Sequence, residues 1–127
     1  MPALTHVVIG TNDLTRARAF YDATLATLGL RRLKDYEGRA SMWGAERPEF
    51  MVATPANGLP ATWSNGGTVS FAAPTHQAVR NFHEIAIENG ALDEGAPGPR
   101  TFLPNAYGAY VRDPDGNKIC AFSFAES

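Results

Sequence analysis

The stretch Leu4-Thr-His-Val-Val-Ile-Gly-Thr-Asn-Asp13 decides the fold of this chain. Its first half alternates like a buried strand, so that Val7 and Ile9 share one face and their neighbours share the other. Its second half offers Asn12 or Asp13 as the cap of a helix. The stretch therefore predicts a strand that leads directly into a helix.

The same pattern returns at Thr68-Val-Ser-Phe-Ala-Ala-Pro-Thr75, where Thr75 can cap a second helix. At one constant offset Val7 corresponds to Val69, and apolar positions of the two helices also coincide. Two long copies favour a duplicated strand–helix module over a solenoid of many short repeats. The alternative, that any strand followed by a capped helix resembles any other, stays open at this point.

The remaining patterns complete two modules of the order β-α-β-β-β. Strands are predicted at 5–9, 30–36, 39–43, 49–54, 68–72, 106–112 and 118–124, helices at 14–28 and 75–88, and one more strand near the start of the weakly patterned segment 92–104. We expect an α+β fold in which two βαβββ modules form a curved, barrel-like mixed sheet with the helices outside. The single domain 1–127 then divides into module one (about 1–54), a Pro-, Gly- and Asn-rich linker (55–67) and module two (68–127).

Composition excludes several classes of function. The chain has 127 residues, 44% of them hydrophobic and 19% charged, with a net charge of −2. Without a basic stripe, nucleic acid is not an expected partner. No apolar segment approaches the roughly 20 residues that span a bilayer, and no signal peptide is evident. The single cysteine excludes an internal disulfide framework and fits a cytoplasmic location.

A pocket is expected where the inner faces of the two sheets meet. The faces left uncovered by the helices carry His6 and Val8 in module one and Thr68 and Ser70 in module two. Two such faces turned toward each other would form a concave, largely uncharged pocket lined from both modules.

The stretch Tyr107-Gly-Ala-Tyr-Val-Arg-Asp-Pro-Asp-Gly-Asn-Lys-Ile119, together with the repeat and the histidine of the first strand, resembles the vicinal-oxygen-chelate superfamily. This superfamily comprises glyoxalase I, bleomycin-resistance protein and extradiol dioxygenase. The resemblance covers essentially the whole chain. It implies a fold of paired βαβββ modules, a small-molecule ligand or substrate, and homodimers that often share modules between chains.

In metal-dependent members the resemblance implies a divalent ion bound by the first and last strands of the modules. The first ligand position falls on His6, but the equivalent position in module two is Thr68, and the last-strand position is Cys120 instead of glutamate. The corresponding place in the fourth strand is Met51. His6 and Cys120 are thus the candidate metal ligands, which is fewer than the three protein ligands usual for catalytic zinc.

Other residues are candidates for ligand contact. Trp43 could form the floor of the pocket, whereas Asn105 and Tyr107 should face its mouth. His6 could act as a general base, and Cys120 is either a buried apolar residue or a thiol activated across the pocket. The candidate ligand-binding residues are Trp43, Met51, Thr68, Ser70, Asn105, Tyr107 and Cys120.

Three functions follow from these features. The first is a binding protein with a degenerate metal site, which holds a small, partly aromatic organic molecule without a cofactor. The second is a metal-dependent lyase, isomerase or dioxygenase in which His6 is one ligand. The third is an interaction module, in which edge strands and Trp63 of the linker contact a second chain.

Overall fold

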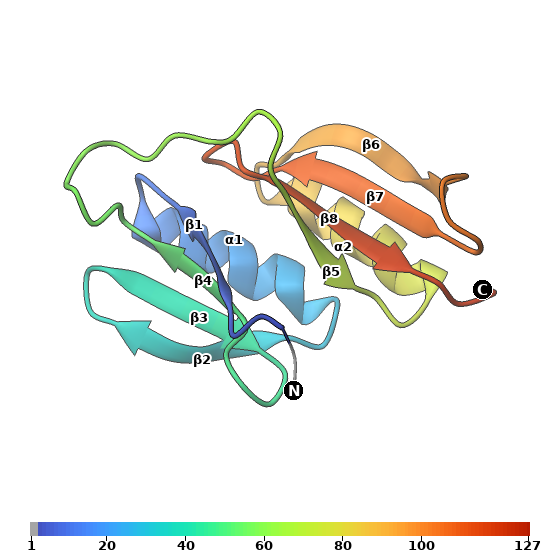
Figure 1. The fold of residues 1–127 in the computed structure, drawn as a ribbon, viewed down its shortest axis with the longest axis horizontal. Helices are drawn as coiled ribbons and strands as arrows, with labels where there is room; N and C mark the ends of the chain where they lie inside the picture. The colour runs from blue at the N-terminus through green and yellow to red at the C-terminus, as the bar shows by residue number, and fades with distance from the viewer. Residues whose placement is uncertain (1–2) are drawn as a thin grey trace.

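The computed structural model describes residues 3–127, so that Met1 and Pro2 of the predicted module one lie outside the described residues. Its elements follow the predicted order β-α-β-β-β twice (Figure 1). They are β1 (Val7–Gly10), α1 (Leu14–Ala26), β2 (Arg31–Tyr36), β3 (Ala40–Gly44), β4 (Phe50–Ala53), β5 (Thr68–Ala72), α2 (His76–Glu88), β6 (Leu92–Pro99), β7 (Tyr107–Arg112) and β8 (Lys118–Ser123).

Each module forms its own four-stranded sheet. The strand orders are β1-β4-β3-β2 and β5-β8-β7-β6, and in both sheets the first strand pairs parallel with the last while the other pairs are antiparallel. Both helices lie behind the sheets in Figure 1 and pack against each other. The α+β prediction is confirmed, although the sheets remain two separate curved sheets and do not close into a barrel.

The two modules repeat the same register. Val7 pairs with Phe50 in module one, and its counterpart Val69 pairs with Ile119 in module two. The next pairs are therefore Val8 with Met51 and Ser70 with Cys120. Because side chains alternate along a strand, these pairs occupy the same place on the faces that the helices leave open.

Both helices begin at caps that the sequence predicts. The Asp13 carboxylate accepts the backbone N–H of Arg16 at 3.0 Å, and the Thr75 hydroxyl accepts that of Ala78 at 3.1 Å. Asp13 is therefore the cap of the first helix. Asn12 instead exchanges two hydrogen bonds with the backbone of Ala61, at 3.1 and 2.7 Å, and so ties the linker to the start of α1.

The core lies between the helices and the sheets. Its largest fully buried side chains are Trp43, Tyr21, Phe20, Phe82, Leu25, Ile119, Val52, Val79 and Val111. Burial of this apolar surface is the main stabilising contribution to the fold. The core is continuous across the modules, since Phe50 of β4 and Phe71 of β5 meet edge to face with ring centroids 5.0 Å apart.

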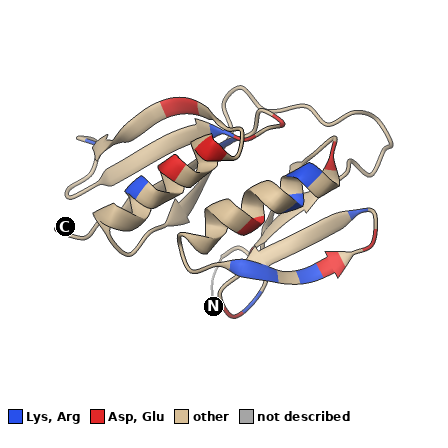
Figure 2. Ribbon diagram, turned by 180° about the vertical axis from the view of Figure 1, so that it is seen from behind, with Lys and Arg blue, Asp and Glu red and all other residues tan. Residues whose placement is uncertain are grey.

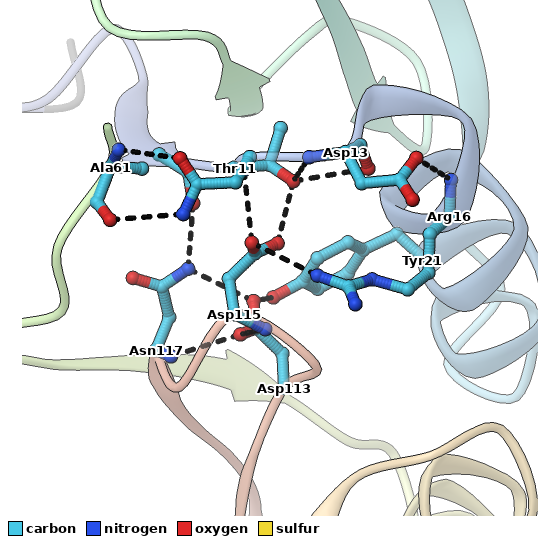
Figure 3. A network of polar contacts seen from close by, with 10 residues as sticks. Thr11, Asp13, Arg16, Tyr21, Ala61, Asp113, Asp115 and Asn117 are labelled. Carbon is cyan, nitrogen blue, oxygen red and sulfur yellow. Dashed lines mark hydrogen bonds and ion pairs between the residues drawn. The ribbon is translucent and has the colours of Figure 1, made fainter. Parts of the chain in front are cut away.

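A polar network also joins the modules (Figure 3). It is centred on Asp113–Asn117 between β7 and β8, which we call the linking turn. Asp115 accepts hydrogen bonds from the Thr11 hydroxyl at 2.5 Å and from Arg16 at 3.2 Å. The Asn117 amide donates to the Gly10 carbonyl at 2.9 Å. The linking turn of module two is thereby fixed to the β1–α1 corner of module one.

The linker packs on the same turn. The Trp63 ring lies against Gly116, so closely that a side chain at position 116 would overlap it. The Arg112 guanidinium lies 5.0 Å from the Trp63 ring and donates to the Ser64 carbonyl at 3.3 Å. Trp63, which the sequence offers as a contact with a second chain, thus acts as a clamp on the domain itself.

Charge is concentrated away from the inner strands. Strands β1, β3, β4 and β5 carry no charged residue. The helices and the edge strand β2 carry both signs, whereas the charged residues of the edge strand β6 are acidic, as the view from behind shows (Figure 2). Over residues 3–127, neither helix has the length and apolar character needed to cross a membrane. Strands β1 and β5 therefore contribute no charge to the open faces of the sheets.

Candidate functional site: the open faces of the two sheets

The open face of the module-two sheet carries a hollow of about 330 Å³, which we call the aromatic hollow. It is lined by Thr68, Ser70, Phe102, Leu103, Tyr110, Cys120, Phe122 and Phe124. Strand alternation explains this set, because β5, β7 and β8 each present every second residue to this face. Segments outside the sheet, on either side of β7 and β8, add Phe102, Leu103 and Phe124.

Phe122 organises the rings of this hollow. Phe102 and Tyr110 meet it edge to face, with centroids 5.8 and 5.6 Å away, and Phe124 stacks on it at 6.1 Å. Phe122 lies flat on β7 because its neighbour there is Gly108, where a Cβ would come within 2.7 Å of the ring. The result is an aromatic surface separate from the main core, since Phe102 and Phe124 are 63% and 55% exposed.

Two cations border the aromatic hollow. The Lys118 amine lies 5.1 Å from the centroid of the Tyr110 ring, and the Arg100 guanidinium lies 5.6 Å from it. Arg100 lies along β6, where Gly95 and Gly98 leave room for it and where it donates to the Gly98 and Ala96 carbonyls, each at 2.9 Å.

Burial sets the protonation of the two titratable groups inside the hollow. Burial raises the pKa of the Cys120 thiol, and a hydrogen bond with Ser70 only partly offsets this effect. Burial also raises the pKa of Tyr110, with a further contribution from the nearby Cys120. Cys120 is therefore a neutral thiol at physiological pH. Activation of this thiol, which the sequence left open, would require a shift in the opposite direction.

The open face of the module-one sheet carries a second hollow of about 510 Å³, here the apolar hollow. Val8 and Met51 lie on it as neighbours in the β1–β4 register, and Tyr36 and Arg39 lie at its edge. Val8 is 52% exposed and Tyr36 is 44% exposed. The apolar hollow of module one corresponds in the repeat to the aromatic hollow of module two, and Met51 takes the place of Cys120.

Between β1 and β5 lies a third space, a cleft of about 500 Å³ that we call the inter-module cleft. His6 and Thr68 both line it, so that these first-strand residues of the two modules face a common space. Glu49 lies at the same cleft, and the His6 ring makes a hydrogen bond of 3.1 Å with the adjacent Thr5 hydroxyl. The main core residues Phe50 and Phe71 form part of its floor.

The structure brings together some of the predicted site residues. Thr68, Ser70 and Cys120 line the aromatic hollow, and Thr68 and Ser70 also line the inter-module cleft beside His6. His6 and Cys120 themselves line different spaces. Met51 lies on the other sheet, in the apolar hollow.

The three remaining predicted residues do not line the aromatic hollow. Trp43 reaches the inter-module cleft but has no exposed surface, and its indole N–H is taken by the Asp22 carboxylate at 3.0 Å. Tyr107 does not face the pocket mouth: its ring stacks on His76 of α2 at 4.0 Å, because β7 turns this position toward the helix. Asn105 lies exposed in the loop before β7 with a positive φ of 62°.

Sequence reasoning missed most of the aromatic hollow. Tyr110 and Phe122 were not selected, although both share the open face with Cys120 through the β7–β8 register. Alternation from Cys120 to Phe122 was a usable signal for that face. No such signal existed for Phe102 and Leu103, because they precede β7 in an irregular segment whose course depends on tertiary packing.

Comparison with known proteins agrees with this architecture. Residues 3–121 match the family model of the Glyoxalase/Bleomycin resistance protein/Dioxygenase superfamily. This chain belongs to that superfamily. No curated protein matches the chain.

Solved structures of the superfamily share the fold. A glyoxalase/bleomycin resistance protein from Albidiferax ferrireducens T118 is 40% identical, with a TM-score of 0.86 over 96% of this chain and 98% of that one. A glyoxalase/bleomycin resistance protein/dioxygenase family enzyme from Burkholderia phytofirmans PsJN is 18% identical (TM-score 0.74; 98% and 100% covered). Lactoylglutathione lyase from Agrobacterium tumefaciens is 21% identical (TM-score 0.66; 97% and 95% covered). The last two likenesses show the fold alone.

The residues at the superfamily's metal-ligand positions do not fit a divalent ion. Within the described chain, no group of three or more His, Cys, Asp or Glu side chains could hold one. Thr68 and Met51 offer only a hydroxyl and a thioether where imidazole and carboxylate are preferred. The two remaining candidates, His6 and Cys120, line different spaces, the inter-module cleft and the aromatic hollow.

Proposed function

We propose that this superfamily member binds a small, partly aromatic organic molecule in the aromatic hollow, without a metal ion held by the protein. The observation that carries the proposal is the exposed aromatic cluster around Phe122, which lies apart from the core and has two side-chain hydroxyls beside it. Apolar and aromatic walls with a few polar groups are typical of small-molecule sites, and the volume of about 330 Å³ suits a ligand of one or two rings.

A fragment screen followed by substitution tests this proposal. Thermal-shift and ligand-observed NMR measurements with uncharged one- and two-ring fragments should find compounds that stabilise the protein. Phe102→Ser should weaken them, because it removes an exposed wall of the hollow at little expected cost to folding. Leu92→Ser is the matched control, since Leu92 is 70% exposed on the outer strand of the same sheet and does not line the hollow.

Divalent metals provide the contrasting arm of this screen. Stabilisation by Zn²⁺, Ni²⁺, Mn²⁺ or Fe²⁺, with no response to any aromatic fragment, would overturn the proposal and favour the metal-dependent lyase, isomerase or dioxygenase. Equal loss of fragment binding in Phe102→Ser and Leu92→Ser would place the site outside the aromatic hollow.

We also propose that the chain forms a homodimer and works in the cytoplasm. Support for the dimer is the apolar hollow, where Val8 and Tyr36 are exposed on a sheet face that a second copy could cover. Support for the location is a lone, buried, free cysteine. Sedimentation at micromolar concentration tests the dimer, and a monomer there would refute it.

A further inference from the structure

The two charged side chains that border the aromatic hollow are both cationic. None of its lining residues is acidic, while Lys118 and Arg100 both approach the Tyr110 ring. Both cations also act on Cys120 inside the hollow: burial raises the pKa of its thiol, and the positive charges of Lys118 and Arg100 each lower that pKa in part. A ligand in this space therefore meets a positive electrostatic potential.

Neither cation is neutralised by a carboxylate. Within residues 3–127 neither Lys118 nor Arg100 forms an ion pair, and Arg100 donates only to backbone carbonyls. By contrast, Arg112, a neighbour of Lys118 on the same sheet face, pairs with Glu94 at 3.0 Å. The positive charge beside the hollow is thus available to a bound anion.

Hydrogen-bond donors lie next to this charge. Thr68 pairs in register with Lys118, so that its hydroxyl and the lysine amine start from adjacent positions on the open face. Ser70 is one step further along the same face and interacts with the Cys120 thiol. An ammonium group and a hydroxyl together can bind the two oxygens of a carboxylate by charge-assisted hydrogen bonds.

We infer that the ligand of the aromatic hollow is a small aromatic carboxylate. Its ring lies among Phe102, Phe122 and Phe124, and its carboxylate points toward Lys118 and Thr68. This inference rests on the proposed function and adds to it the charge of the ligand. A cationic ligand is disfavoured by the same two side chains.

Titration calorimetry with three molecules of one shape tests the inference: naphthoate, naphthamide and naphthylmethylammonium. On the full chain, naphthoate should bind about fivefold more tightly than the uncharged amide, as a partly exposed charge pair allows, and the ammonium compound most weakly. The preference should shrink as salt is raised to about 0.5 M, because the groups are accessible to screening.

Substitution of Lys118 locates the effect. Lys118→Met should bring naphthoate and naphthamide to similar affinities while leaving the amide unchanged, and Lys118→Arg should retain the preference. Lys34→Met is the matched control, because the Lys34 amine also lies over a tyrosine, 5.5 Å from the Tyr36 ring, but on the other sheet. Circular dichroism confirms that each variant is folded.

The outcomes separate the two proposals. Equal binding of all three molecules, or a naphthoate preference that survives in Lys118→Met, overturns the inference on charge and leaves the proposed aromatic site intact. No binding of any of the three, together with a negative screen of uncharged fragments, overturns both.

Discussion

The Tyr21 hydroxyl of helix α1 donates a hydrogen bond of 2.5 Å to the Asp113 carboxylate of the linking turn (Figure 3). Both groups are buried, and they belong to different modules. The carboxylate also accepts the side-chain amide of Asn117 at 3.0 Å and the backbone N–H groups of Asp115 and Asn117, each at 2.9 Å. One buried carboxylate therefore fixes the shape of the turn and its position on module one at the same time.

Tyr21→Phe should destabilise the protein by about 1–3 kcal/mol, because it leaves a buried carboxylate short of one donor. Urea unfolding followed by circular dichroism measures the loss. Tyr36→Phe is the control, since Tyr36 is 44% exposed and should change the free energy of unfolding by less than about 0.5 kcal/mol. Equal effects of the two substitutions would contradict the structural role of the Tyr21–Asp113 hydrogen bond.

Asp113 should also give stability a distinctive pH dependence. Burial raises the pKa of Asp113 above its usual value of 3.8, although its hydrogen bonds partly oppose this shift. Between the unfolded and the folded pKa, Asp113 keeps its proton in the folded protein but has lost it in the unfolded chain. The contribution of this proton to the free energy of unfolding is therefore complete below pH 3.8 and is lost as pH rises through the folded pKa.

In Asp113→Asn this titration is absent. The difference in unfolding free energy between wild type and Asp113→Asn should therefore narrow as pH rises above about 4, and then stay constant. Urea titrations at several pH values between about 4 and 7 would show it. A difference that widens with pH over this range would mean that the hydrogen bonds outweigh burial and lower the pKa of Asp113.

Gly116→Ala should weaken the attachment of the linker. Gly116 has a φ of 93°, and an added Cβ would overlap the Trp63 ring. Gly38→Ala separates the strain of a positive φ from the overlap with Trp63, because Gly38 has a φ of 67° and open space around it. We expect Gly116→Ala to cost about 1–2 kcal/mol more than Gly38→Ala, and this excess to vanish when Trp63 is also changed to Ala. An excess that persists without Trp63 would refute the clamp.

Cys120 should react slowly with thiol reagents. Only 1% of its surface is exposed, and its raised pKa leaves little thiolate at neutral pH. Labelling by iodoacetamide at pH 7 should be at least about tenfold slower in the folded protein than in urea. Rapid labelling of the folded protein would show that the aromatic hollow opens readily or that the thiol is activated after all.

The fold was predictable because its signals are local and repeated. The Asp13 and Thr75 caps, the alternating first strands and the turn at Asp113–Asn117 each specify structure within a few residues. Strand β6 was the weakest prediction. Its sequence LDEGAPGP contains glycines and prolines that depart from any strand pattern, and its pairing with β7 is irregular at Gly95 and Gly98.

The site was predictable only in part. Thr68 and Ser70 were found because alternation assigns them to the open face, and Cys120 was found because it occupies the last-strand ligand position that the superfamily resemblance implies. The rest of the aromatic hollow depends on how the segment around Phe102 folds back on Phe122, and no periodicity records that contact. Tyr107 was misplaced for a related reason, because its face could not be assigned until the β7–β8 register was known.

The packing of Trp63 on the linking turn also implies that the two modules would stay associated if the linker were cut. The contacts of the linker with Asn12 and with the linking turn come from Ala61, Trp63 and Ser64, all beyond Gly58. A break at Gly58 would give two fragments, each with a complete βαβββ unit, that fit together through the buried carboxylate and the tryptophan. This arrangement suits the molecule to fragment complementation, in which reassembly of the two halves reports the association of two proteins that each carry one half.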